Sequence, residues 1–422
     1  MLWGDWAEWY ALPLLCDRIH GRNKILTQRE SGGHTKAASY HSFPSNLHAV
    51  GIDEAVKIAK LEYDNIKATH SFAREMDVQC DSWEGETLDV FYDEGQLESA
   101  KRAVQMIRDA VGVGAEIDGT VAWAKYSIWN SDEVRAKSGV DGEEVVGGVS
   151  YYAGSIHAYK FVCGVLKLCL GMGMKLFTET PVLDIRRAVD GMWMVETSEG
   201  IVRASRVILA TNAYTAFLRR EFQGSIVPLR GQVTVQRPGK TLSSMKHALA
   251  GSYSFIYKDG YDYMIRRPQG SIDADDLVIG GGLTKADHQG LYEYGNTDDS
   301  TINLDISTYI SKVLPQRFGK QIWGEDHDDG RIKLEWSGIM GYSPDGYPFV
   351  GQVGEEKGLW VCAGFQGHGM VMCIMCAKAL IKMVMGRHEG LEEWFPKAWE
   401  VSEERLERKF EGSFHVSGGN DV

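Results

Sequence analysis

Apolar residues recur every three to four positions in several long segments of this chain, which is the spacing of one face of an α-helix. Between residues 52 and 76 this apolar stripe alternates with charged side chains, which predicts a long amphipathic helix. The same spacing predicts helices over 97–111 and 159–170. A shorter helix is predicted over 306–314, ended by Pro315, because proline lacks the amide that a continuing helix needs.

Shorter apolar runs that end in turn residues predict strands. One run stops at Asp93-Glu94-Gly95 and another at Ser198-Glu199-Gly200, both typical turn sequences. An apolar run at the far end of the chain leads into the glycine-rich stretch Gly364 to Met370 and then into an apolar helix over 371–385. The predicted strands cover residues 87–92, 175–178, 182–186, 192–197, 201–210, 226–236, 261–266 and 359–362.

The composition is that of a large globular protein. The chain has 422 residues, of which 44% are hydrophobic and 24% charged, enough for two folding units with a substantial core. Acidic residues outnumber basic ones by 58 to 45, which gives a net charge of -13 without a basic run. This charge argues against nucleic acid or an anionic membrane as a partner.

The N-terminal segment and the cysteines bear on where the protein works. Residues 1–15 contain Asp5 and Glu8 and no basic segment, so they predict neither a signal peptide nor a membrane-spanning helix. Seven cysteines are scattered through apolar runs, which suits reduced thiols, and the pair Cys373 and Cys376 lies in the body of a predicted helix. We expect a cytoplasmic protein without a metal site, and the sequence indicates no oligomeric state.

Eight short motifs follow one another along the chain. Each alone is a weak signal, but the eight in this order are a strong one. They are Gly32-Gly33-His34-Thr35-Lys36, Gly154-Ser155-Ile156-His157, Thr180-Pro181-Val182-Leu183-Asp184-Ile185, Ala210-Thr211-Asn212-Ala213-Tyr214, Val227-Pro228-Leu229-Arg230-Gly231-Gln232, Arg267-Pro268 with Gly280-Gly281-Gly282, Ser343-Pro344-Asp345-Gly346-Tyr347-Pro348, and Gly364 to Met370.

Together these motifs resemble the FAD-dependent oxidoreductases of the D-amino acid oxidase, glycine oxidase and sarcosine oxidase type. Within that group they are most similar to the fungal and bacterial branch that includes γ-glutamylputrescine oxidase-like proteins. The resemblance implies a mixed α/β fold, in which a Rossmann-like parallel sheet that binds FAD is interleaved with an antiparallel, β-rich substrate domain. The FAD-binding domain is expected to comprise residues 1–80, 151–215 and 331–395, the substrate domain residues 81–150 and 216–330, and the C-terminal tail residues 396–422.

The resemblance also implies which residues hold the cofactor. Val182 would offer its backbone polar groups to adenine, although it reads equally well as a plain strand valine. Gly364 and Gly367 would let the backbone approach the flavin, and the helix that follows would stabilise negative charge on the reduced ring. The remaining expected cofactor contacts are Gly32, Gly33, Thr211, Asn212, His368, Gly369 and Met370. No cysteine precedes Pro344-Asp345, the attachment stretch of the covalent branch, so bound FAD should be non-covalent.

Four residues are expected to face the substrate. The resemblance implies that His34 and His368 lie near the reacting face of the ring, whereas a loop histidine in solvent is the alternative for His34. It also implies that Tyr263 and Arg267 line the substrate side, where Arg267 or its neighbour Arg266 would hold a carboxylate by a bidentate pair. A surface ion pair is the alternative for whichever arginine points outward.

The beginning of the chain departs from the family pattern. The family begins with a strand, a G-x-G-x-x-G turn and a helix, followed by a strand ending in an acidic residue that holds the ribose. Residues 1–31 contain no such motif, and only Gly21-Arg22-Asn23 echoes the segment that follows it. Because pyrophosphate would lack its helix N-terminus and ribose its carboxylate, we expect an N-terminally incomplete sheet and weak FAD binding. A change of splice or start site would produce this pattern.

The leading functional hypothesis is FAD-dependent oxidation of a small amine or amino-acid-like substrate by hydride transfer to flavin, with oxygen as the acceptor. A second hypothesis keeps the flavin but takes a CH–OH sugar or polyol as donor, in a fungal secondary-metabolite pathway. A third is a cofactor-poor remnant, or a truncated gene model, with a non-catalytic binding role.

Overall fold

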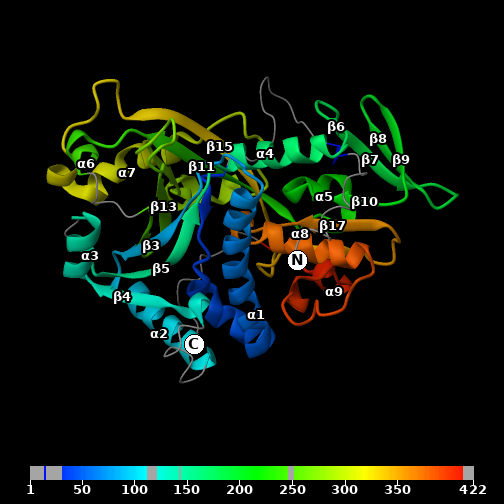
Figure 1. Cartoon of the computed structure of the whole chain (residues 1–422), viewed down its shortest axis with the longest axis horizontal. Coiled ribbons are helices and arrows are strands. Elements are labelled where there is room, and N and C mark those ends of the chain that lie inside the picture. The colour runs from blue at the N-terminus through cyan, green and yellow to red at the C-terminus, as the bar shows by residue number, and fades with distance from the viewer. Residues whose placement is uncertain (1–13, 16–30, 112–120, 142–143, 246–250, 412–422) are drawn as a thin grey trace.

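The computed structural model describes residues 14–15, 31–111, 121–141, 144–245 and 251–411. Figure 1 shows a large sheet on one side, several small sheets on the other, and the long helix α1 running between them. This arrangement confirms the predicted mixed α/β fold. Within the described residues, no helix combines the length and apolarity needed to cross a membrane.

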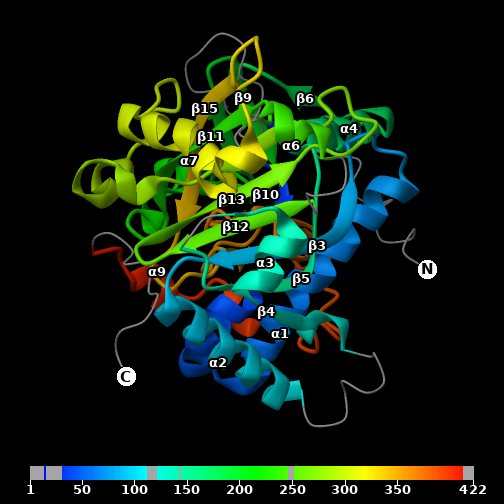
Figure 2. The ribbon, with the colours of Figure 1, turned by 90° about the vertical axis from the view of Figure 1, so that its left-hand side faces the viewer.

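The large sheet has nine strands in the order β15-β11-β14-β13-β12-β3-β5-β2, and β4 pairs with β5 beside this path. Its neighbours are antiparallel except for β12 and β3, which are parallel; Figure 2 shows both beside β5 and β13. The bounds are β2 (His34–Thr35), β3 (Trp83–Phe91), β4 (Tyr126–Asn130), β5 (Gly147–Ser155), β11 (Val227–Gln236), β12 (Ser252–Tyr257), β13 (Gly260–Arg266), β14 (Leu277–Gly280) and β15 (Ile332–Tyr342).

The two faces of this sheet differ in character. One face packs its apolar side chains against helix α7 (Leu304–Trp323) and the shorter α6 (Lys240–Ser244) and α3 (Ser131–Ser138). On the other face, the strand register aligns Asp89, Ser254, Tyr263 and Gly280 in one row across four neighbouring strands. Paired residues in register point to the same side of a sheet, so this row forms one continuous surface.

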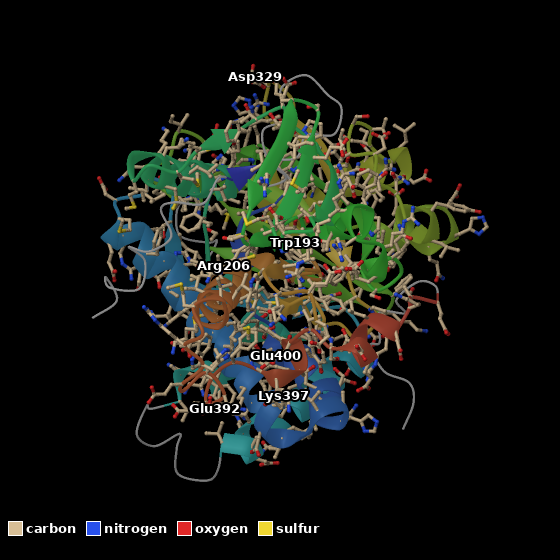
Figure 3. The ribbon with its side chains drawn as sticks, turned by 90° about the vertical axis from the view of Figure 1, so that its right-hand side faces the viewer. Trp193, Arg206, Asp329, Glu392, Lys397 and Glu400 are labelled. Atoms are coloured by element: carbon tan, nitrogen blue, oxygen red, sulfur yellow. The ribbon has the colours of Figure 1, made fainter. Side chains whose placement is uncertain are left out.

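Three small sheets make up the other side of the molecule. Strand β10 (Val207–Leu209) runs parallel to β17 (Leu359–Ala363), which is antiparallel to β16 (Phe349–Gln352). Trp193, labelled in Figure 3, is buried in the core that joins these strands to the sheet β7-β8-β9. That sheet and the two-stranded parallel sheet have the bounds β7 (Val182–Arg187), β8 (Trp193–Thr197), β9 (Gly200–Ala204), β1 (Leu14–Leu15) and β6 (Leu176–Phe177).

The predicted strands are found, with one correction. The apolar run over 201–210 is interrupted at Ser205 and Arg206, so it forms the end of β9 and all of β10. The proposed domain boundaries stay a prediction. We note that β15, which falls in the range assigned to FAD binding, pairs along its length with β11 from the range assigned to the substrate.

The helices over 97–111, 159–170 and 371–385 are confirmed. The helix over 52–76 is confirmed as the second part of α1, because Gly51, with a φ of 82°, divides this element into two helices. One predicted boundary is wrong, since helix α7 continues past Pro315 and, beyond a kink at Gly319, reaches Trp323. The burial of Leu314 and Phe318 against the sheet outweighs the amide lost at the proline. The other helices are α1 (Ser39–Glu75), α2 (Glu94–Val111), α4 (Ala158–Gly171), α5 (Thr215–Leu218), α8 (Cys373–Val384) and α9 (Glu403–Glu407).

Candidate active site

Two of the predicted cofactor loops are joined by a single side chain. The turn after β10 places Asn212 so that its Oδ1 accepts hydrogen bonds from the amides of Gly364, at 3.0 Å, and Phe365, at 3.3 Å. Asn212 has a φ of 44°, a left-handed conformation that asparagine tolerates better than most residues. Beside it, the hydroxyls of Thr211 and Thr215 hydrogen-bond at 2.9 Å. Asn212 therefore fixes the turn after β10 to the start of the glycine loop, whereas the predicted cofactor contacts of Thr211, Asn212 and Gly364 stay predictions.

The glycine loop is held in shape by Gln366. Its Nε2 donates to Ser343 Oγ at 2.7 Å and to the Gly364 carbonyl at 2.9 Å, and its Oε1 accepts from the Ser343 amide at 3.2 Å. The side chain of Gln366 is buried, and the backbone of this residue is also left-handed, with a φ of 55°. The sequence interpretation did not single out Gln366, whose only signal was its position inside Gly-Phe-Gln-Gly-His-Gly.

Position 367 requires glycine for two reasons, its left-handed backbone conformation and the close packing of strand β15 against it. It has a φ of 71°, and a Cβ on it would lie 2.9 Å from Met340 Sδ and 3.2 Å from Tyr342 Oη. The atoms that exclude a side chain at Gly367 therefore belong to β15. A substitution there would disturb the loop directly.

His368 is fixed in one tautomer by the loop. Its Nδ1 lies 2.8 Å from the Gln366 carbonyl, which can only accept, so Nδ1 carries the proton and Nε2 presents a lone pair. The side chain is exposed, yet burial among protein atoms lowers its pKa, and the charge of Lys36 lowers it further. His368 is therefore neutral at neutral pH.

The short turn after His368 is tied to α1. Asn65 donates from Nδ2 to the Met370 carbonyl at 3.1 Å and accepts from the Met375 amide at 3.0 Å. It thereby satisfies one of the amides that the start of α8 leaves without a helical partner. Gly369 and Met370, both predicted cofactor contacts, lie in the 3-10 turn Gly369–Val371 between the glycine loop and this helix.

The Gly32-Gly33-His34 segment packs against the polar row of the large sheet. Gly33 has a φ of 82°, and a Cβ on it would come within 1.9 Å of the Ile156 carbonyl oxygen. A Cβ on Gly32 would lie 2.6 Å from the ring of Tyr263. The ring centroids of His34 and Tyr263 are 6.1 Å apart. The predicted residues Gly32, Gly33, His34 and Tyr263 are thus brought together.

His34 has an unsatisfied nitrogen. Its Nε2 is buried and has no hydrogen-bond partner among the described residues. Burial, followed by the charge of Lys36, lowers the pKa of His34 well below its ordinary value. A buried nitrogen without a partner is costly in a finished core, so this atom marks a place where a ligand or water completes the structure.

A buried ion pair, which the sequence interpretation missed, lies beside both histidines. Lys36 donates to the carboxylate of Asp89 and to the hydroxyl of Ser254. The hydroxyls of Tyr40, at 2.6 Å, and Tyr151, at 2.8 Å, donate to Asp89 Oδ2. Burial alone would raise the pKa of Asp89, but the nearby cation holds it well below its usual value, so the pair is charged and its net charge is zero.

Arg267 lies beside the Gly32-Gly33-His34 segment. It follows β13 directly, is buried, and donates through Nη1 at 3.4 Å to the carbonyl of Ile156, whose amide in turn donates to the Gly33 carbonyl. Burial lowers the pKa of Arg267. Arg266 is paired with Asp275. The role of either arginine in holding a substrate carboxylate stays a prediction.

Val182 occupies a third position. It starts β7 and is buried in the core cluster that also contains Leu209 and Val361. These two residues lie on β10 and β17, the strands that lead into the Asn212 turn and the glycine loop. Its adenine contact stays a prediction. At the N-terminus, the two-residue strand Leu14–Leu15 lies parallel to β6, whereas the Gly21-Arg22-Asn23 echo falls outside the described residues.

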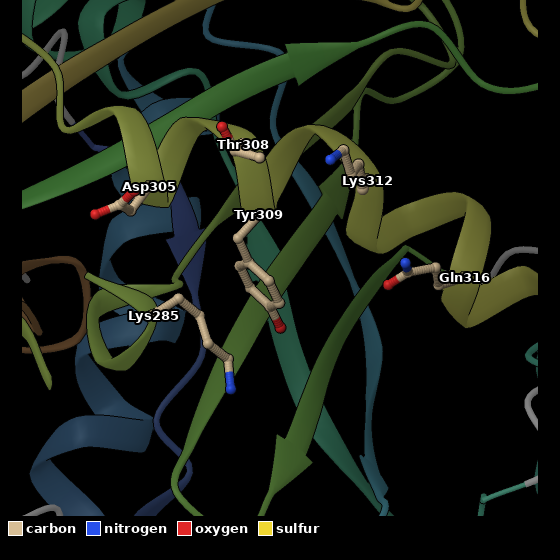
Figure 4. A pocket seen from close by; sticks show the side chains of 6 residues that line it. All are labelled: Lys285, Asp305, Thr308, Tyr309, Lys312 and Gln316. Atoms are coloured by element: carbon tan, nitrogen blue, oxygen red, sulfur yellow. The ribbon is translucent and has the colours of Figure 1, made fainter. Parts of the chain in front are cut away.

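A separate groove lies on the other face of the large sheet. It has a volume of about 350 Å³, and Figure 4 shows it beside α7, lined by Lys285, Asp305, Thr308, Tyr309, Lys312 and Gln316. Tyr309 donates at 2.6 Å to buried Asp262, which precedes Tyr263 on β13 and therefore points to the opposite face. The groove shares no lining residue with the two glycine loops.

Comparison with known proteins identifies the family of this chain. The family model described as FAD dependent oxidoreductase matches residues 22–383. The chain belongs to this family. Its expected cofactor is FAD. The buried His34 Nε2, which has no hydrogen-bond partner among the described residues, leaves a place for a bound group, whereas the contacts of the glycine loops and His368 with the flavin stay predictions.

Individual relatives are distant. The chain is 20% identical over 366 residues to the probable oxidoreductase OrdL of Haemophilus influenzae, which covers 86% of this chain and 75% of that protein. It is 24% identical over 216 residues to the glycine oxidase of Pseudomonas aeruginosa, covering 51% of each. The solved glycine oxidase of Geobacillus kaustophilus has the same fold, with a TM-score of 0.66 at 17% identity over 86% of each chain.

Proposed function

We propose that this protein oxidises a small amine or amino-acid-like substrate at the carbon next to nitrogen, with oxygen as the electron acceptor. The observation that carries the proposal is the meeting of two glycine loops and two uncharged histidines over the polar row of the large sheet. FAD supplies the acceptor for the hydride when it is bound. The protein binds, orients and deprotonates the substrate.

The histidines suit the proton part of this reaction. An amine must lose its ammonium proton before its C–H bond can be broken as a hydride. Nε2 of His368 presents a lone pair, because burial holds the ring neutral and Nδ1 carries the proton. Burial also holds His34 neutral, so its Nε2 can accept a proton in the tautomer that is protonated at Nδ1. We assign the acceptance of this proton to Nε2 of His34, which has no partner among the described residues.

The experiment is an anaerobic titration of the protein in excess FAD with candidate amines. Bleaching of the flavin band, followed by formation of hydrogen peroxide when air is admitted, supports the proposal. A flavin that dithionite reduces but that no amine or amino acid reduces would contradict it. His34→Asn should slow the reduction and remove the acid limb of its pH profile, where His34 becomes protonated. His48→Asn, at an exposed histidine before the kink of α1, is the matched control.

We further propose that FAD is bound non-covalently and weakly. Residues 1–31 carry no G-x-G-x-x-G turn, so two or three charge-assisted contacts of roughly 1.5 to 3 kcal/mol each are lost at the pyrophosphate and ribose. Flavin should leave the protein on acid denaturation. Flavin fluorescence should give a micromolar or weaker dissociation constant that a grafted strand–G-x-G-x-x-G–helix unit tightens; submicromolar affinity in the ungrafted chain would contradict this proposal.

A further inference from the structure

The groove beside α7 is formed by one face of that helix and the turn next to it. Five of its six lining side chains follow one another at the spacing of successive helical turns: Asp305, Thr308, Tyr309, Lys312 and Gln316. The sixth, Lys285, ends the 3-10 turn Leu283–Lys285 (Figure 4). All six side chains end in a polar or charged group, so a ligand in the groove would be bound by hydrogen bonds and charge.

The Tyr309 side chain is held in place by a buried carboxylate. Its hydroxyl donates at 2.6 Å to Oδ2 of Asp262, which is fully buried. Oδ1 of Asp262 accepts from the Gly282 amide at 3.0 Å, and Nη2 of Arg317 lies 3.9 Å from Oδ2. One wall of the groove is therefore formed before a ligand arrives, which reduces the entropy lost on binding.

Lys285 is positioned by aromatic rings. Its Nζ lies 4.4 Å from the centroid of the Tyr257 ring and 5.4 Å from that of Tyr309. Burial raises the pKa of Asp262, whereas the charges of Arg317 and Lys285 lower it, so both cations lie near this carboxylate. One carboxylate balances only one of these two cations. A positive charge is therefore left over beside the groove.

Lys312 adds a second cation to the lining. It is exposed and forms no ion pair with any residue that the structure describes. The lining carboxylate, Asp305, lies seven residues earlier on α7, which is roughly 10 Å along the helix axis. The groove and the pair behind Tyr309 together carry three cations and two carboxylates: Lys285, Lys312, Arg317, Asp262 and Asp305.

This local excess of positive charge contrasts with the net charge of -13 of the whole chain. An anion is repelled by most of an acidic surface, so a groove that carries two ammonium groups is where it would bind. A cationic ligand would meet two ammonium groups and one exposed carboxylate there. The charges therefore favour an anion.

We propose that the groove is a second ligand site, which binds a small organic anion through carboxylate or phosphate oxygens that accept hydrogen bonds from Lys285 and Lys312. Bonds of this kind between an ammonium group and an anionic oxygen are stronger than those between neutral groups. The volume of about 350 Å³ is that of a pocket for a small molecule. The groove lies on the face of the sheet opposite to Tyr263, so this ligand and an oxidation substrate can be bound together.

The test is isothermal titration calorimetry of the full chain, as purified, in a buffer without phosphate. The probes are succinate, citrate and glycerol 3-phosphate, with the uncharged succinamide as the comparison. We expect at least one of the three anions to bind with a dissociation constant below about 1 mM, and succinamide to give no binding heat. The more tightly bound anion distinguishes a carboxylate ligand from a phosphate ligand. Absence of binding by all three anions, or equal binding of succinamide and succinate, would overturn the proposal.

Substitutions locate the bound anion. Lys285→Ala and Lys312→Ala should each weaken its binding about tenfold or more, because each removes a charge-assisted hydrogen bond. Lys312→Arg keeps the charge and should bind the anion more tightly than Lys312→Ala does. Lys320→Ala is the matched control, at an exposed lysine of the same helix that does not line the groove. Unchanged affinity in both alanine variants of the groove, or an equal loss in Lys320→Ala, would show that the anion binds elsewhere and would overturn the proposal.

Discussion

Asp89→Asn tests whether the pair beneath the histidines is a buried charge pair. The Asp89 side chain is fully buried and that of Lys36 is 9% exposed, so neutralising the carboxylate leaves an ammonium group with a hydroxyl and an amide in place of its counter-ion. Breaking one member of a buried pair typically costs about 3 to 5 kcal/mol of stability. We expect the free energy of unfolding to fall by that amount.

The assay is urea unfolding of the protein without added FAD, followed by tryptophan fluorescence. The double variant Lys36→Met with Asp89→Asn should be more stable than Asp89→Asn alone, because it removes the uncompensated cation. Asp328→Asn is the control, since the exposed pair of Lys240 and Asp328 should contribute no measurable stability. If Asp89→Asn unfolds at the wild-type urea concentration, or if the two substitutions are simply additive, Lys36 and Asp89 do not form a buried charge pair.

Three further predictions concern stability and the loop. Burial raises the pKa of Glu62 from 4.5 to about 8, so between these pH values the folded protein keeps a proton that the unfolded chain loses. Stability should therefore fall as the pH rises from about 4.5 to 8. The urea midpoint should depend less on pH in Glu62→Gln than in the wild type, and an unchanged dependence would refute the assignment. Gly367→Val should abolish FAD binding, because the valine would collide with Met340 and displace the loop. The circular dichroism spectrum should stay that of the folded protein. A variant that still binds flavin would show that the loop has another role. Arg405→Met should lower the free energy of unfolding in urea by about 3 to 5 kcal/mol, because it removes the guanidinium that donates to Asp345 and to three backbone carbonyls. A decrease of less than about 1 kcal/mol would contradict this reasoning.

The glycine motifs were predictable from sequence because their chemistry is local. A glycine loop between an apolar strand and an apolar helix can be located from its own sequence. The hydrogen bond between Asn212 and the Gly364 amide was not predicted, because it joins two distant motifs. The Ser343 to Pro348 motif was also recognisable, but its purpose was not. Asp345 in that motif binds Arg405, 60 residues further along, through two hydrogen bonds.

The missed residues depend on contacts between distant parts of the chain. Lys36 and Asp89 read as an ordinary lysine and an ordinary strand aspartate, and only the pairing of β3 with β12 brings Ser254 to both of them. Helix α7 was ended too early for a similar reason, since packing against the sheet and not the local sequence carries it past Pro315. The contact between Arg267 and Ile156 joins two of the recognised motifs, but their pairing in space could not be predicted from either motif alone.

The parallel pairing of β3 with β12 also affects how the protein comes to be folded. The two strands are separated by well over a hundred residues, and one of them must wait for the other before Asp89 meets Ser254. Closing such a long loop is slow, and parallel pairing cannot begin from a tight hairpin. Until β12 has been synthesised, the edge of β3 that it covers has not met its partner strand. A chain interrupted before β12 therefore has the glycine motif of its N-terminal half but lacks Ser254, Tyr263 and Gly280, which complete the polar row.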